Sequence, residues 1–330
     1  MCEPHFELKL RIKGARTRTL MILIVNLNLA VDHIVEVEEL RAGEVQRSRG
    51  TLAVAGGKGV NVARVLKTLG EESLLSGFAG GRAGELITAG LRAENIASLL
   101  TRVREESRTC LIINDRARGQ QTVINAPGAN VGEAEWRDFE ATYTRELPRA
   151  GLVIINGSLP PGLPPDTYAR MTTAAHAAGG RVLLDCAGAP LGHALGARPF
   201  LVKINGAEAA ELSGAPVADF PAAARAARHL RERGAENAMI TLGEQGALLD
   251  FAGGRYRFSA PQVRAVNSVG SGDAALAGLA AALRRGQTAE EAGALAVAAG
   301  AANALHGAGG CSAEEIAELR PRVRCEVEEG

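Results

Sequence analysis

The sequence contains little lysine, few aromatic residues, no excess of either charge and no long hydrophobic run. Lysine occurs five times among 37 basic residues, aromatic side chains make up 3% of the chain, and 37 acidic residues balance the basic ones. A general nucleic-acid binder is excluded, because such proteins need a basic excess to neutralise phosphates. No stretch approaches the ~20 apolar residues of a membrane span. The apolar run at 21–25 is followed by Asn26, Asn28 and Asp32, so we expect no membrane partner.

Cysteine is scarce as well, and its arrangement excludes two further classes of protein. The five cysteines are widely spaced and include no Cys-x-x-Cys pair: Cys2, Cys110, Cys186, Cys311 and Cys325. An odd number at such spacings is not typical of a disulfide framework or a zinc site. The six histidines show no His-x-x-x-His spacing. The pattern indicates reduced thiols and a cytoplasmic location.

The length and the order of elements predict an α/β fold. The 330 residues suffice for two domains, or for one large α/β domain with an appendage, at roughly 150 residues per domain. Short apolar runs bounded by turn residues predict buried strands at 21–28, 152–156, 182–185, 201–205 and 238–242. Helical patterns lie between them at 60–69, 166–178, 222–233 and 273–285. This alternation predicts a mostly parallel, doubly wound sheet with helices on both faces and ligands at the carboxyl ends of its strands.

Two stretches break the alternation and have period-two character. Within residues 33–54 and 107–125, the paired extended segments are 33–37 with 44–54 and 108–114 with 120–125. Neither pair has a helix between its segments, so we expect a small antiparallel β lid beside the main sheet.

The first twenty residues differ from the rest of the chain. Residues 1–20 carry five basic residues and little apolar periodicity, and Met21 stands where the first strand begins. We predict a disordered extension or a misassigned start, with the folded domain at 21–330.

A turn of small residues precedes the predicted helix at 273–285. Gly270, Ser271 and Gly272 lead into Asp273. Backbone N–H groups at a helix start are unpaired and attract anions, and glycine permits close approach to the backbone. Asp273 is placed to accept a proton from a hydroxyl group while the N–H groups hold a phosphoryl group. The alternative is an ordinary helix-capping aspartate.

A second glycine-rich turn opens the helix at 60–69. It contains Gly57, Lys58 and Asn61, and its glycine spacing fits neither a P-loop nor a dinucleotide fingerprint. Lys58 and Asn61 are three residues apart and share one helix face. The turn is either the polar floor of a site for a hydroxylated ligand or a surface turn.

The two motifs, in this order, resemble the PfkB (ribokinase-like) carbohydrate kinase family over about residues 21–310. The resemblance implies a three-layer α/β fold with a β lid. It implies that Asp273 is the catalytic base and that Gly270, Ser271, Gly272 and Asp273 supply the anion hole for a γ-phosphate. It also implies that Gly57, Lys58 and Asn61 bind the sugar.

Further segments resemble the subgroup of tagatose-6-phosphate kinases and 1-phosphofructokinases. Asn28-Leu29-Ala30-Val31-Asp32 resembles its Asn-Pro-Ala-x-Asp motif, and Asp32 would hold sugar hydroxyls. Arg108 resembles the arginine that binds the substrate phosphate. Ser158 lies in a turn like its Ser-Gly-Ser-Leu-Pro-x-Gly and would hydrogen-bond the same phosphate. Without the resemblance, Asp32 would be a turn residue and Arg108 a solvated charge.

The same resemblance implies which residues bind the nucleotide and the metal ion. Lys203, Asn205 and Glu208 fit a Lys-Pro-Asn-x-x-Glu motif, in which Asn205 and Glu208 orient Mg²⁺ through water, and Asp185 is a further metal candidate. Asn205 and Glu208 also have the spacing of a helix capping box, and both readings can hold together. The expected nucleotide-binding residues are Lys203, Asn205, Thr241, Gly243, Gly246 and Asn303.

These observations predict an ATP- and Mg²⁺-dependent kinase that converts fructose 1-phosphate or tagatose 6-phosphate to the 1,6-bisphosphate. A kinase of an unphosphorylated sugar or nucleoside is the first alternative, and a non-catalytic sugar-phosphate-binding protein is the second. A nicotinamide dehydrogenase is set aside, since no Gly-x-Gly-x-x-Gly follows the first strand. A homodimer through the lid is expected from the resemblance, because exposed lid edges invite pairing between subunits.

Overall fold

The computed structural model describes residues 20–251, 253–306 and 310–328. Residues 1–19 of the predicted extension, and Cys2 with them, lie outside the described residues. No helix in the described part of the chain has the length and apolarity needed to cross a bilayer.

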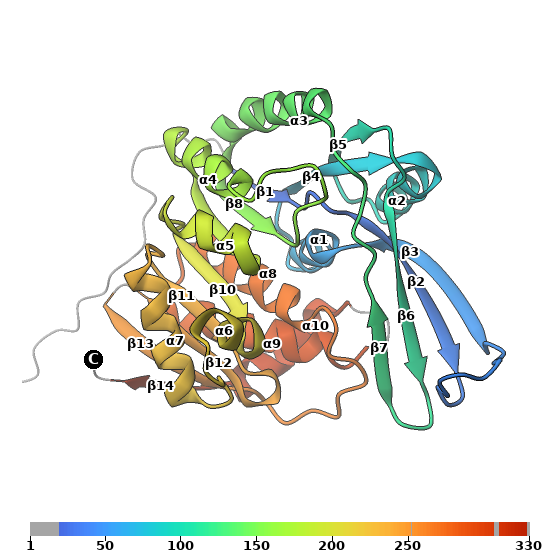
Figure 1. Ribbon diagram of the computed structural model, residues 1–330. Helices are drawn as coiled ribbons and strands as arrows, with labels where there is room; N and C mark the ends of the chain where they lie inside the picture. The colour runs from blue at the N-terminus through green and yellow to red at the C-terminus, as the bar shows by residue number, and fades with distance from the viewer. Residues whose placement is uncertain (1–19, 252, 307–309, 329–330) are drawn as a thin grey trace, which may run out of the picture.

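The main sheet has ten strands among the described residues, in the order β14-β13-β12-β11-β10-β9-β8-β1-β4-β5 (Figure 1). Their bounds are β1 (Met21–Val25), β4 (Ser73–Gly80), β5 (Ser98–Val103), β8 (Ala150–Asn156), β9 (Arg181–Asp185), β10 (Leu201–Asn205), β11 (Ala238–Thr241), β12 (Gly246–Phe251), β13 (Gly254–Ser259) and β14 (Arg324–Glu328). All pairs from β11 to β5 are parallel, and β11 to β14 pair antiparallel. The predicted mostly parallel sheet is confirmed.

Helices cover both faces of this sheet, because buried side chains alternate between two cores. Ile22 and Ile24 of β1 face one core, and Leu23 and Val25 face the other. The first core is closed by α1 (Lys58–Thr68), α2 (Gly81–Ala93), α8 (Ser271–Arg284), α9 (Ala289–Asn303) and α10 (Ala313–Leu319). The second is closed by α3 (Glu133–Glu146), α4 (Thr167–Ala177), α5 (Gly188–Leu195), α6 (Gly206–Ser213) and α7 (Phe220–Glu232). Short 3₁₀ turns are η1 (Leu147–Arg149), η2 (Gly243–Gln245) and η3 (Arg320–Arg322). This is the three-layer architecture expected from the sequence.

The lid is a separate four-stranded sheet that extends from the main body (Figure 1). Its strands are β3 (Gly50–Gly56), β2 (Ala30–Val37), β6 (Arg108–Asp115) and β7 (Gln120–Ile124), in that order. β2 pairs antiparallel with β3 and β6 with β7, while β2 and β6 pair parallel. Two antiparallel hairpins therefore join side by side through one parallel contact.

Several strand boundaries differ from the sequence expectation, and local features explain two of them. β1 ends at Val25 rather than at 28, because the side chains of the next asparagines bond to loops. Asn26 accepts a hydrogen bond from N of Gly59, and Asn28 donates to Pro127 and Ser158. β3 begins at Gly50 rather than at 44. Residues 41–49 are almost all exposed and rich in charge, so no apolar face holds them in a strand.

Candidate active site

A cavity of about 1190 Å³ opens at the carboxyl edge of the main sheet, beneath the lid. The edge includes the ends of β1, β8, β9, β10 and β11, where a doubly wound sheet holds its ligands. Most of the predicted site residues line the cavity: Asp32, Gly57, Lys58, Asn61, Arg108, Ser158, Lys203, Asn205, Glu208, Thr241, Gly243, Gly246, Gly270, Ser271, Gly272 and Asp273. Asp185 and Asn303 are not among the lining residues and are buried behind them.

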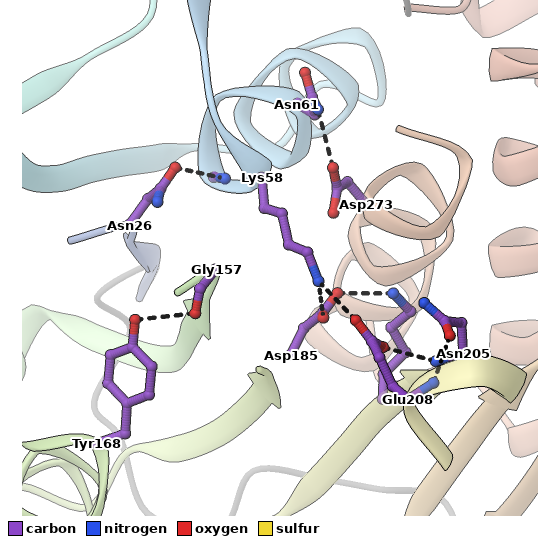
Figure 2. Close-up of polar contacts among 11 residues, drawn as sticks. Asn26, Lys58, Asn61, Gly157, Tyr168, Asp185, Asn205, Glu208 and Asp273 are labelled. Atoms are coloured by element: carbon purple, nitrogen blue, oxygen red, sulfur yellow. Dashed lines mark hydrogen bonds and ion pairs between the residues drawn. The ribbon is translucent and has the colours of Figure 1, made fainter. Parts of the chain in front are cut away.

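Asp273 lies in the first turn of α8 and is 6% exposed. Its Oδ2 accepts a hydrogen bond from Nδ2 of Asn61 on α1, at 2.9 Å (Figure 2). Burial, together with the negative charge of Asp185, raises the pKa of Asp273 to about 6, against the opposing pull of Lys203 and Lys58. A carboxylate of this kind is ionised at neutral pH and is a stronger base than an ordinary aspartate.

The turn before Asp273 has the backbone geometry of an anion site. Gly270 is the N-cap of α8 and has a φ of +81°, a conformation that favours glycine. A Cβ at Gly272 would lie 2.8 Å from Nζ of Lys203. The N–H of Ser271 donates to O of Ser268, whereas those of Gly270, Gly272 and Asp273 have no backbone partner among the described residues. These N–H groups and the ammonium group of Lys203 therefore lie at the same place.

Asp185 lies at the end of β9, is fully buried, and binds two lysines (Figure 2). Its Oδ1 accepts from Nζ of Lys58 and its Oδ2 from Nζ of Lys203, both at 2.7 Å. Burial favours the neutral carboxyl group, but the two ammonium groups hold the pKa of Asp185 below its ordinary value. Burial opposes the charged form of Lys58, but Asp185 and Glu208 raise the pKa of Lys58 well above its usual range. Two cations are thus fixed beside Asp273.

Asn205 and Glu208 form the capping box of α6. Oδ1 of Asn205 accepts from N of Glu208, and Oε2 of Glu208 accepts from N of Asn205, each at 2.9 Å. The remaining oxygen, Oε1 of Glu208, lies 3.4 Å from Nζ of Lys58. Among the described residues, no group of three or more His, Cys, Asp or Glu side chains could hold a metal ion. This donor set fits Mg²⁺ held mainly by phosphate oxygens and water, which suits that ion.

The turn at Gly57 is held against the end of β1. Oδ1 of Asn26 accepts from N of Gly59 at 3.0 Å (Figure 2), and Gly57 has a φ of +112°. A Cβ at Gly56 would lie 2.1 Å from the carboxyl carbon of Asp32, so that carboxyl packs directly on the turn. Burial raises the pKa of Asp32, against Arg64, Arg108 and an N–H of Gly57. A carboxylate and backbone groups therefore face the cavity together.

Arg108 and Ser158 lie together where the lid meets the main sheet. Nε of Arg108 donates to the backbone oxygen of Asn28, and its Nη1 donates to that of Ala126, both at 3.2 Å. Oγ of Ser158 accepts from Nδ2 of Asn28 at 3.0 Å. Asn28 belongs to a motif noted in the sequence, but the motif gave its side chain no role.

The far end of the cavity is lined by small and apolar residues. Thr241, Gly243 and Gly246 lie there with Ala260 and Val263. Val297, Gly300 and Ala301 of α9, and Ala304 directly after this helix, also line the far end. Sequence reasoning missed these α9 residues, although their three-to-four-residue spacing is the signal of one helix face.

Asn303 is 2% exposed and lies behind the turn that precedes α8. Its Nδ2 donates to O of Val269 at 2.9 Å and to Oγ of Ser271 at 3.2 Å, and its Oδ1 accepts from N of Gly310 at 2.9 Å. Its amide is thereby committed to holding the turn in shape.

Two of the cysteines line the cavity, Cys110 on β6 and Cys186 after β9. Burial raises the pKa of both thiols, so they are neutral at physiological pH. The four cysteines within the described residues are Cys110, Cys186, Cys311 and Cys325, and all are free thiols.

Comparisons with known proteins agree with this geometry. The sequence profile of the pfkB family carbohydrate kinases matches residues 21–315. The chain is similar to a 1-phosphofructokinase of Bacillus subtilis, with 35% identity over 305 residues that cover 92% of this chain and 99% of the relative. A 1-phosphofructokinase of Xanthomonas campestris is 38% identical over 271 residues, which cover 80% of this chain and 85% of the relative. Among solved structures, phosphofructokinase-2 from Escherichia coli in complex with substrates and products has a TM-score of 0.86 and 28% identity. The match covers 92% of this chain and 99% of that structure.

Proposed function

Because the chain belongs to the pfkB family of carbohydrate kinases, we propose that it transfers the γ-phosphoryl group of ATP to the 6-hydroxyl of fructose 1-phosphate. The observation that carries the proposal is that Asp273 and Arg108 line one cavity. The first is a buried base, and the second is a cation that forms no salt bridge with any described carboxylate. Both curated relatives reported above are named 1-phosphofructokinase. Neither name supports tagatose 6-phosphate, which is therefore the second substrate to test.

Asp273 is the proposed catalytic base. Asn61 fixes one carboxylate oxygen, at 2.9 Å from its Nδ2, and leaves the other for the attacking hydroxyl. With a pKa raised to about 6, Asp273 is ionised at neutral pH and gains in basicity. Asp32, with the turn at Gly57, Lys58 and Asn61, would hold the sugar hydroxyls and align the 6-hydroxyl with Asp273.

The phosphoryl group would be stabilised by charge rather than by covalent chemistry. Gly270, Ser271, Gly272 and Asp273 line the cavity at the start of α8, and Nζ of Lys203 lies beside Gly272. The N–H of Ser271 donates to O of Ser268, so the N–H groups of Gly270, Gly272 and Asp273 would hold the phosphoryl group. Phosphoryl transfer gains most of its rate from such positioning and electrostatics.

The nucleotide would occupy the end lined by Lys203, Asn205, Thr241, Gly243 and Gly246. Mg²⁺, when bound, would neutralise charge on the transferring phosphates. Glu208 and Asn205 would hold it through water. Asp185 fits a role other than metal binding, because both of its carboxylate oxygens already accept hydrogen bonds from lysines. We assign it the positioning of Lys58 and Lys203. Asn303 would support the anion hole from behind rather than contact the base.

The lid would close over the sugar and exclude water. Its cavity side carries an apolar row across all four strands: Leu52, Ile34, Ile112 and Val123, which are register partners. Leu52 remains 51% exposed and Val123 39% exposed. This uncovered row supports a homodimer in which each lid packs against a second copy.

A coupled ADP-release assay with ATP and Mg²⁺ tests the substrate. Fructose 1-phosphate, tagatose 6-phosphate, fructose 6-phosphate and fructose are run in parallel. We expect fructose 1-phosphate to have a kcat/KM far above that of the other three. A preference for tagatose 6-phosphate would change the substrate and keep the chemistry. Turnover of fructose alone would favour a kinase of unphosphorylated sugars. No turnover of any sugar by folded protein would favour a non-catalytic binding protein.

A further inference from the structure

Asn28 lies behind the cavity wall and contacts Ser158 and Arg108, the two residues expected to bind the phosphate of the sugar. It is 4% exposed, in the turn after β1. Its Nδ2 donates to O of Pro127 at 2.9 Å and to Oγ of Ser158 at 3.0 Å. Its backbone oxygen accepts from Nε of Arg108 at 3.2 Å. We propose that Asn28 is a positioning residue that sets specificity for the phosphate of the sugar by orienting Ser158 and Arg108. The inference rests on the proposed function.

The backbone oxygen of Pro127 fixes which way the Asn28 amide points. A carbonyl oxygen only accepts, so the amide nitrogen faces Pro127. Its two hydrogens are then shared between Pro127 and Ser158, and the Ser158 oxygen is the acceptor. No described residue accepts the Ser158 hydroxyl proton. That proton is therefore available to a phosphate oxygen in the cavity.

The guanidinium of Arg108 is oriented in a similar way. Two backbone oxygens, those of Asn28 and Ala126, take Nε and one hydrogen of Nη1. Arg108 has five donors, so at least three remain, including both on Nη2. Since no described carboxylate pairs with it, its charge is available to an anion. Asn28 thus contacts both groups and directs their unused donors to one place.

The segment that contains Pro127 also fixes Asn28 itself. Pro127 and Ala126 belong to the segment that returns from lid strand β7 to the main body. A Cβ at Gly128, which has a φ of +110°, would lie 2.2 Å from Oδ1 of Asn28. This close approach leaves the amide no room to turn, and it ties the end of β1 to the base of the lid.

The Asn28→Asp variant tests the proposal, because it keeps the shape of the side chain. A carboxylate at this position would accept the Ser158 proton and repel the substrate phosphate. We expect KM for fructose 1-phosphate to rise by about tenfold or more, the effect of losing a hydrogen bond to a charged group. We expect kcat and KM for ATP to stay within about twofold of wild type, since a positioning role confined to this subsite leaves them unchanged. The Asn28→Ala variant should also raise KM for fructose 1-phosphate, by a smaller factor, with kcat and KM for ATP again near wild type.

Asn237→Ala is the matched control. Asn237 is equally buried, and its Nδ2 donates to O of Phe200 at 2.7 Å, but it precedes β11 at the opposite edge of the sheet. Its loss should lower the melting temperature and leave KM for fructose 1-phosphate unchanged. In a Ser158→Ala background, Asn28→Ala should add less than it does alone, because the two residues act through one hydrogen bond.

The outcomes separate this inference from the proposed function. If wild type does not prefer fructose 1-phosphate to fructose, the proposed function fails first. If wild type has that preference and Asn28→Asp keeps its KM, the inference is wrong. A rise of KM for ATP as large as that for the sugar phosphate would also overturn it, since this would mean a general structural role.

Discussion

At the scale of single residues, the site combines buried charged side chains, each of which would destabilise the fold if it had no partner. Asp273, Asp185 and Lys203 are all buried. Asp185 is compensated by two lysines, whereas Asp273 accepts only one amide hydrogen bond among the described residues. The different environments of the two carboxylates separate their pKa values, one raised and one lowered. This separation favours Asp273, rather than Asp185, as the proposed base.

The raised pKa of Asp273 predicts that its removal stabilises the fold. In the folded state the pKa of Asp273 is raised to about 6 from the ordinary aspartate value of 3.8. Stability contributed by the protonated form is therefore present below about pH 4 and is lost as the pH rises through 6. Asp273→Asn should unfold at a higher temperature than wild type at pH 8, with a gain of about 1–3 kcal/mol. Melts at pH 8 and pH 4 should show this gain only at pH 8; an equal gain at both pH values would argue against a charged, buried Asp273.

At the scale of elements, the turn before α8 must adopt one backbone shape. Gly270 has a φ of +81°, and an added Cβ would lie 3.5 Å from the amides of Asn303 and Asn61. Space is therefore available, and the cost of a side chain is the backbone conformation, about 1 kcal/mol or more. The relaxed turn would move its N–H groups away from the phosphoryl group.

We expect Gly270→Ala to lower kcat at least tenfold, because misplaced anion-hole donors typically cost about 10²–10³ in rate. Gly70→Ala is the control, with a φ of +74°, no neighbour within 4 Å and a place after α1. Both variants should lose similar stability in thermal melts. Normal turnover by Gly270→Ala would mean that the turn does not hold the phosphoryl group.

The end of β9 carries Asp185, and we expect the stability of the fold to depend on its carboxylate. Asp185→Asn would leave Lys203, whose side chain is 3% exposed, without its counter-charge. Breaking a buried pair in this way costs about 3–5 kcal/mol. Urea unfolding should show this loss, and turnover should fall as Lys58 and Lys203 lose their positions.

Asp250→Asn is the control for that experiment. Asp250 on β12 also lies between two cations, Arg231 and Arg255. Its partner Arg231 is 43% exposed, so water replaces part of the lost interaction. This variant should lose less stability and keep its kcat. If the two variants behave alike, Asp185 has no special function in the site.

At the scale of the whole molecule, the lid row of Leu52, Ile34, Ile112 and Val123 predicts a dimer. Light scattering should give about twice the 34.3 kDa of one chain. Leu52→Glu would place a charge in the row and should give monomers. Val327→Glu is the control, since Val327 is exposed on β14 at the far edge of the main sheet. Leu52→Glu protein that stays dimeric would exclude the lid as the interface.

Much of this architecture could be predicted from the sequence, because its signals are local. Alternating strands and helices gave the doubly wound sheet, and the carboxyl ends of its strands bring distant motifs to one edge. The partners of buried polar groups could not be predicted in this way. Lys58 and Asp185 are 127 residues apart, and Asn28 and Ser158 are 130 residues apart. No local pattern records such pairs, so the early end of β1 and the buried place of Asn303 also required the structure.

The proposed role of Asp273 is tested most directly by the turnover number for fructose 1-phosphate in wild type and in Asp273→Asn, measured by ADP release at saturating ATP and sugar phosphate. A general base contributes about 10²–10⁴-fold. We expect a fall of that size in protein that remains folded and still binds both substrates. A turnover number within a few-fold of wild type would contradict it and would place the base elsewhere in the cavity.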